Sequence, residues 1–459
     1  MSTPKPLFER AAAAPAKTLE RAVKGAQKMG RAGGSNSALQ KARAYWNMLG
    51  PGITTGASDD DPSGIATYSQ TGAQYGFQFL WLAPLTFPLM AVVQEMCARI
   101  GLASGRGLAA NLRKFFPRWV LLLVTSLLFI ANAFNIGADL GAMAEATRLL
   151  FPQVPTWVFL VFFTFLSLLL QIYASYERYA RYLKWMALVL LAYVVAVFLV
   201  PSINWSDVAA STVIPHIKFE KEQIILVTAI LGTTISPYLF FWQTSQEVEE
   251  DILAGQTTLK ERQQSTSKEV IHRMRIDVWS GMFLSNLVMF FIILLCGAVL
   301  HTSGLTHITT AAEAAAALKP LGGSNASLLF TFGIVGTGLL AVPVLAGSSS
   351  YALAETFGWK EGLYRSLNQA YSFYGILIIS MLIGLGANFI GIDPVDALIA
   401  SAVVNALVAP LVLIPIVLLS ANRRVMGQWV NSKVTSVVGW FVVAIMVLAG
   451  GGAIWGLIK

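Results

Sequence analysis

The sequence is poor in charged residues. Only 12% of its 459 residues are Asp, Glu, Lys or Arg, whereas 56% are hydrophobic. Soluble domains average about 25% charged residues. The mean hydropathy of +0.64 and several apolar runs long enough to cross a bilayer therefore predict an integral membrane protein.

Cysteine and catalytic motifs are also scarce. The two cysteines, Cys97 and Cys296, both fall inside apolar runs, so a disulfide framework is not expected. A Walker loop, a nucleophile elbow and a phosphate-binding glycine loop are all missing. Neither ATP-driven pumping nor catalysis is indicated, and we expect a protein that is not an enzyme and has no cofactor.

Hydropathy and helix breakers divide the chain into two parts. Residues 1–45 are Ala-rich and basic without a sustained apolar core, which predicts a cytosolic tail rather than a signal peptide. Residues 46–459 form a predicted transmembrane domain of eleven helices. The expected spans are 44–76, 78–101, 118–146, 156–173, 183–200, 223–245, 277–300, 327–352, 369–391, 394–420 and 435–457.

The distribution of basic residues predicts the topology. Placing the tail in the cytoplasm puts most of the 32 Lys and Arg residues on the inner side, so we expect a cytoplasmic N-terminus and an outer C-terminus. The net charge of +8 then reflects anchoring to membrane lipid and not a nucleic-acid partner. The expected location is the plasma (inner) membrane. The oligomeric state is left open, and a monomer is compatible with the sequence.

Two of the expected spans are interrupted by polar residues and a proline. The first contains SDDDPSG at 58–64, and the sixth contains GTTISPY at 232–238. Each would begin a five-helix half, and interrupted helices at matching positions of two halves indicate a midplane binding site between inverted repeats. Because five is odd, the second half must enter the membrane from the opposite side.

The acidic triplet supplies the chemistry of this site. A carboxylate at the centre of a span costs roughly 2.5–3.5 kcal/mol, unless water or a cation accompanies it. Asp61, directly before Pro62, is expected to cap a restarted half-helix and to bind a hard divalent cation with freed backbone carbonyls. Asp59 and Asp60 are either further ligands or solvated wall residues. Thr233 and Thr234 carbonyls or the Ser236 hydroxyl would complete the site.

The residues around the first span carry a family resemblance. The stretches 50–76 and 99–106, with weaker similarity at 346–350 and 413–415, resemble the Nramp family of proton-coupled divalent metal transporters. The resemblance implies a LeuT-like, all-α fold with two inverted five-helix repeats and an eleventh helix. It implies a divalent metal ion as the transported partner.

Several ligand positions depart from the family pattern. The family's asparagine in the first span is Gly64 here, and its methionine in the sixth span is Ser236. The family's glutamine in the tenth span falls on Val408, with Asn405 one turn away. The candidate metal ligands are Asp61, Asp60, Asp59, Ser58, Gly64, Thr233, Thr234, Ser236 and Asn405.

The proton pathway of the family is also altered. The family's histidine is Tyr238 here, Asp139 is kept in the third span, and the acidic residue three positions later is Ala142. Asp139 and Tyr238 are therefore the remaining candidates for a proton relay, and proton coupling is expected to be weak or absent.

These departures favour a hard ion. A thioether prefers soft metals, whereas oxygen ligands suit Mg²⁺ and Mn²⁺. We expect an importer of Mg²⁺ or Mn²⁺, with Fe²⁺ as a further candidate, similar to Nramp-related magnesium transporters. The alternatives are an ordinary proton-coupled Mn²⁺/Fe²⁺ symporter and a LeuT-type sodium symporter of an organic solute, against which the acidic triplet argues. A membrane sensor or enzyme is a third alternative, for which the sequence offers no domain or catalytic constellation.

Overall fold

The computed structural model describes residues 50–173, 190–201, 203–218 and 220–458. These residues form helices and no strand. The predicted tail 1–45 and the beginning of the fifth span lie outside the described residues. Eight described helical segments are long and apolar enough to cross a membrane, and α19 is a shorter apolar helix.

The helices that lie within the predicted spans follow those spans closely. They are α3 (Pro51–Asp59), α4 (Pro62–Tyr75), α5 (Leu82–Ser104), α7 (Arg118–Arg148), α8 (Thr156–Tyr173), α10 (Leu191–Phe198), α12 (Lys221–Thr234), α13 (Pro237–Leu253), α15 (Lys268–Cys296), α18 (Ala326–Phe357), α19 (Tyr371–Ala387), α20 (Pro394–Ala421) and α22 (Lys433–Ile458). Shorter helices connect them: α6 (Leu108–Phe115), α11 (Trp205–Val213), α14 (Leu259–Ser265), α16 (Ala311–Ala316), α17 (Lys319–Gly322) and α21 (Arg423–Met426).

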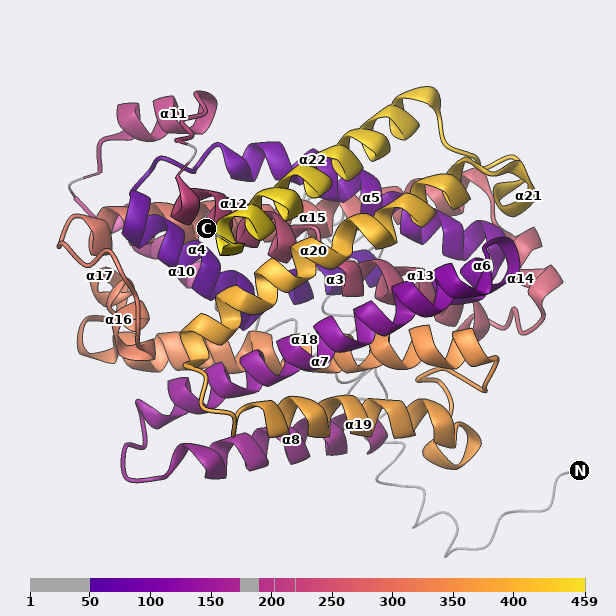
Figure 1. The fold of residues 1–459 in the computed structure, drawn as a ribbon, viewed down its shortest axis with the longest axis horizontal. Helices are drawn as coiled ribbons and strands as arrows, with labels where there is room; N and C mark the ends of the chain where they lie inside the picture. The colour runs from indigo at the N-terminus through magenta and orange to yellow at the C-terminus, as the bar shows by residue number, and fades with distance from the viewer. Residues whose placement is uncertain (1–49, 174–189, 202, 219, 459) are drawn as a thin grey trace, which may run out of the picture. The chain divides into compact units, whose positions relative to one another are not determined.

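Two spans are broken in the middle, as the sequence predicts. The first is divided into α3 and α4 and the sixth into α12 and α13, each break lying directly before a proline. Helix α7 packs against α18, α19 and α20, and α15 packs against α3, α4 and α5. In Figure 1, α8 runs beside α19, from which it is far apart in sequence, and α20 runs beside α22.

The first half-helix is fastened to α15 at its N-terminus. Helix α3 has no side-chain cap of its own, and the buried carboxylate of Asp277 accepts hydrogen bonds from the backbone N–H groups of Gly50, Gly52 and Ile53 at 2.6–3.1 Å. A Cβ at Gly52 would lie 2.6 Å from the backbone nitrogen of Val278. Glycine therefore lets the two backbones touch while Asp277 satisfies the free N–H groups.

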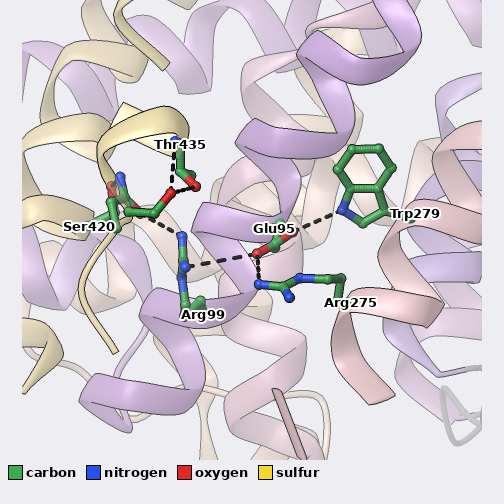
Figure 2. A network of polar contacts seen from close by, with 8 residues as sticks. Glu95, Arg99, Arg275, Trp279, Ser420 and Thr435 are labelled. Atoms are coloured by element: carbon green, nitrogen blue, oxygen red, sulfur yellow. Dashed lines mark hydrogen bonds and ion pairs between the residues drawn. The ribbon is translucent and has the colours of Figure 1, made fainter. Parts of the chain in front are cut away.

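A partly buried cluster of ion pairs and hydrogen bonds holds α5 against two other parts of the fold (Figure 2). Glu95 on α5 accepts from Arg275 at 2.8 Å and from the Trp279 indole at 2.9 Å, both on α15. Arg99, one turn along α5, lies 3.9 Å from Glu95 and donates to Asn431 in the loop before α22. Because every charge has partners, this polar cluster is tolerated inside the fold.

Candidate metal site

The first break turns the three consecutive aspartates in different directions. Helix α3 ends at Asp59, and Asp60 leaves the helical conformation with φ −83° and ψ 56°. Asp61 is extended, with φ −70° and ψ 171°, and Pro62 begins α4. All three aspartates are buried. The change in backbone direction at Asp60 separates side chains that a continuous helix would space about 100° apart.

Asp61 caps α4 and faces α7. One of its carboxylate oxygens accepts from the backbone N–H of Gly64 at 2.7 Å, which bears out its predicted place as the N-cap. The other oxygen accepts from the Asn135 amide at 3.1 Å. Asn135 in turn accepts from the Ser401 hydroxyl of α20 at 2.9 Å. The sequence reading missed Asn135 and Ser401, whose only signal was polarity within otherwise apolar spans.

Asp59 and Asp60 face α15 instead. The Ser285 hydroxyl lies 2.5 Å from an Asp59 oxygen and 3.3 Å from an Asp60 oxygen. The second Asp59 oxygen has no hydrogen-bond partner among the described residues. The sequence reading also missed Ser285. The expectation that Asp59 and Asp60 are solvated wall residues is wrong for this structure, because their side chains are at most 2% exposed.

Asp139 is the fourth buried carboxylate near the break. It lies on α7 one turn from Asn135, is fully buried, and its charge interacts with that of Asp61. Neither of its oxygens has a hydrogen-bond partner within the described ranges. A buried carboxylate without partners is costly, so this position requires a proton, water or a cation.

At the second break, the side-chain hydroxyl groups donate hydrogen bonds to nearby backbone carbonyls. Helix α12 ends at Thr234, and Ser236 precedes Pro237 at the start of α13. The Ser236 hydroxyl donates back to the carbonyls of Gly232 and Thr233 at 2.8 and 2.7 Å, and the Thr234 hydroxyl donates to Ile230. The hydroxyl hydrogens at this break are therefore used within the chain, while the oxygen lone pairs stay available to an ion.

A hydrogen bond joins the two breaks. The Tyr238 hydroxyl donates to the carbonyl of Ser58 at 2.8 Å, and both residues are buried. The Ser58 hydroxyl donates to Thr54 within α3. Tyr238 thus acts as a structural donor between α13 and α3, and the carbonyl of the candidate ligand Ser58 accepts its hydrogen bond.

The remaining candidates line the space between the half-helices. A Cβ at Gly64 would lie 3.1 Å from the Thr233 hydroxyl oxygen and 3.4 Å from the Asp59 carbonyl oxygen. The absence of a side chain at Gly64 therefore leaves space beside both of these oxygen atoms. Asn405 on α20 is buried, and its amide oxygen has no partner in the part of the chain that the structure describes.

A cavity of about 220 Å³ lies beside the first break. Pro62, Ala66 and Ser69 of α4 form one wall, and Ala142 and Glu145 of α7 form another. Asp393, at the start of α20, is also part of its lining. The cavity therefore lies against the first residues of α4.

The donor set suits a hard ion that keeps part of its water. The described residues contain no group of three His, Cys, Asp or Glu side chains placed to hold a metal. Any ion at the first break must therefore bind few carboxylates together with neutral oxygens and water. Mg²⁺ and Mn²⁺ accept such ligands, and Mg²⁺ in particular retains several waters.

Known families resemble this chain over most of its length. A family model described as natural resistance-associated macrophage protein-like matches residues 52–456. The divalent metal cation transporter MntH of Klebsiella pneumoniae is 28% identical over 433 residues, which cover 92% of this chain and 97% of that protein. MntH of Deinococcus radiodurans is 26% identical over 418 residues, covering 90% of each chain.

Solved structures share the fold. The crystal structure of a manganese transporter from Eremococcus coleocola superposes with a TM-score of 0.70 at 19% identity, covering 91% of this chain and 87% of that one. The nucleobase-cation-symport-1 family transporter Mhp1, in a closed conformation, gives a TM-score of 0.53 at 15% identity over 89% and 92% of the two chains. The predicted LeuT-like fold of two inverted repeats is confirmed.

Proposed function

The chain belongs to the natural resistance-associated macrophage protein-like (Nramp) family, and from this premise we propose that it carries Mg²⁺ or Mn²⁺ through a site centred on Asp61. Like the MntH proteins that it resembles, it is a multi-pass membrane transporter of divalent metal cations. It is not an enzyme. A sodium symporter of organic solutes is thereby set aside.

The observation that carries the proposal is the buried carboxylate of Asp61 at the end of a half-helix. Asp61 sits between α3 and α4, where the backbone is not helical, and one of its oxygens points to α7. A cavity is lined by Pro62, the residue that follows Asp61 in the chain. A buried negative charge beside an accessible cavity attracts a cation, and the neighbouring polar groups are mostly oxygens.

Selectivity for hard ions follows from two positions. Ser236 supplies a hydroxyl where the family motif has a methionine, so the site lacks that thioether ligand for soft metals. Gly64 supplies no side chain where the motif has an asparagine. With fewer protein ligands the ion keeps more of its bound water, and Mg²⁺ usually keeps several water ligands in proteins. Fe²⁺ is a weaker candidate for the same reason.

Transport is proposed to be weakly coupled or uncoupled to protons. Tyr238 replaces the motif's histidine and donates its hydroxyl hydrogen to Ser58, and a tyrosine has an unperturbed pKa near 10. Ala142 cannot titrate, so Asp139 is the relay candidate that remains on α7. A membrane potential supplies about 2.3 kcal/mol per charge per 100 mV, or about 4.6 kcal/mol for a divalent ion. Such a driving force suffices for accumulation without protons.

The proposed setting is a plasma (inner) membrane with the N-terminus in the cytoplasm. The excess of basic residues in the loops assigned to the inner side supports this orientation. The ion would then enter through the cavity near Pro62 and leave past α3.

Metal flux into proteoliposomes tests the function. The purified chain should take up Mg²⁺ and Mn²⁺ faster than Ca²⁺ or Cd²⁺, and an interior pH dye should report no acidification during Mn²⁺ uptake. Asp61→Ala should reduce uptake of every ion to the rate of protein-free liposomes, because the charge at the break is lost.

The matched control removes an aspartate elsewhere. Asp207 is exposed in α11, and Asp207→Ala should leave uptake unchanged. Wild-type uptake by a folded Asp61→Ala protein would refute the site assignment. Stoichiometric proton entry that disappears in Asp139→Asn would show instead that Asp139 alone sustains proton coupling.

A further inference from the structure

The carboxylates around the first break fall into two pairs. Asp61 and Asp139 interact on the side of α7, whereas Asp59 and Asp60 lie together at Ser285 on the side of α15. All four are at most 2% exposed. The proposed transport site is centred on Asp61 of the first pair, and the second pair has no role in it.

The Asp59–Asp60 pair is poorly satisfied by the protein. The two carboxylates share one neutral donor, the Ser285 hydroxyl, and the other charges that act on Asp60 come from Asp59 and Asp61. One Asp59 oxygen has no hydrogen-bond partner among the residues described. Two adjacent buried carboxylates repel each other unless a cation or a proton lies with them.

A second side chain near this pair also lacks a partner. Tyr68 on α4 is fully buried, its hydroxyl has no hydrogen-bond partner in the described part of the chain, and the charges that act on it are those of Asp59, Asp60 and Asp61. The Thr233 hydroxyl oxygen and the Tyr68 ring both approach Gly64. The Ser285 hydroxyl of α15 therefore contacts the pair directly, and hydroxyl groups from α4 and α12 lie near the same break.

Charge balance points to two ions. Four ionised carboxylates carry four negative charges, and one divalent cation neutralises only half of them. A divalent cation at each pair would neutralise all four, and low dielectric surroundings make that compensation strongly favourable. Buried ion pairs and metal ions are the usual way in which such charge is tolerated.

We propose that Asp59, Asp60 and Ser285 form a second divalent-cation subsite, with Tyr68 and Thr233 holding water molecules around the ion. This inference rests on the proposed function, because it takes Asp61 as the first site. Since α3 ends at Asp59 and α4 begins after Asp61, the second subsite lies on the α3 side of the first.

Mn²⁺ binding to the purified full chain tests the second subsite. Calorimetry should give two Mn²⁺ ions per chain, and electron paramagnetic resonance should show the dipolar broadening of two nearby ions. The Asp59→Asn/Asp60→Asn protein should bind one ion and lose the broadening. Ser285→Ala should weaken one of the two binding steps severalfold, because it removes the donor that orients both carboxylates.

The outcomes separate this inference from the proposed function. Loss of one ion in Asp61→Asn, with two ions kept in Asp59→Asn/Asp60→Asn, would overturn the second subsite and leave the first intact. The reverse pattern would overturn the assignment of Asp61. A single Mn²⁺ per wild-type chain, found independently by anomalous scattering at the manganese edge, would show that protons neutralise the second pair. Thermal unfolding checks that each variant folds.

Discussion

The two helix breaks have the same backbone plan but opposite chemistry. Each lies directly before a proline at the start of a half-helix. The first presents three buried carboxylates to α7 and α15, whereas the second turns its hydroxyl hydrogens back on its own carbonyls. In this inverted repeat, the break in the first half contributes the negatively charged side chains. The break in the second half contributes a non-helical backbone and neutral oxygen atoms.

The largest expected change comes from giving the second break a soft ligand. Ser236→Met should raise the affinity for Cd²⁺ about tenfold relative to Mn²⁺, because a thioether binds soft ions well. Calorimetry with both ions on both proteins measures the ratio.

Ser236→Ala is the control for this substitution. It removes the hydroxyl without adding sulfur and should leave the ratio near that of the wild type. An unchanged Cd²⁺ affinity in a folded Ser236→Met protein would mean that residue 236 does not face the ion, and that the second break contributes only shape.

A moderate change is expected from filling the space at Gly64. Gly64→Asn adds an amide ligand and displaces water, so Mg²⁺ uptake should fall roughly threefold more than Mn²⁺ uptake, since Mg²⁺ dehydrates reluctantly. Fluxes of both ions in proteoliposomes give the ratio.

Gly64→Ala separates the effect of an added amide ligand from the effect of added side-chain volume in this experiment. A Cβ would lie 3.1 Å from the Thr233 hydroxyl oxygen, so the alanine protein adds the crowding without the amide. Equal losses for both ions in Gly64→Asn would indicate that only bulk matters, and that the missing ligand at the first break does not set selectivity.

The smallest change is expected from cutting the link between the breaks. Tyr238→Phe removes the hydrogen bond to the Ser58 carbonyl and should cost roughly 0.5–1.5 kcal/mol of stability. Mn²⁺ uptake should stay within about a factor of two, and thermal unfolding measures the loss of stability. A collapse of uptake at unchanged stability would instead identify the tyrosine hydroxyl as part of the transport chemistry.

Much of the fold was predictable because lipid imposes a strong pattern. Apolar runs, basic loops and the prolines after Asp61 and Ser236 located the spans and both breaks. The N-cap role of Asp61 followed from the residue before a proline. The directions of the Asp59 and Asp60 side chains could not be predicted, because they depend on the backbone angles of Asp60.

The partners of the aspartates were beyond the sequence reading for a related reason. Asn135 is 74 residues from Asp61, and Ser285 is 226 residues from Asp59. Within their spans these residues look like many other buried polar groups, such as Asn132 and Asn286. Only the packing of α7 and α15 against the break selects them, and one sequence carries no signal of that packing.

The cap that Asp277 provides for α3 also constrains how the chain is made. The N–H groups of Gly50, Gly52 and Ile53 receive their acceptor from a residue more than 220 positions later. During synthesis the first half-helix therefore waits, with open N–H groups, until α15 has been translated and inserted. The N-terminal hydrogen bonds of the first span are thus completed only once the seventh span is present.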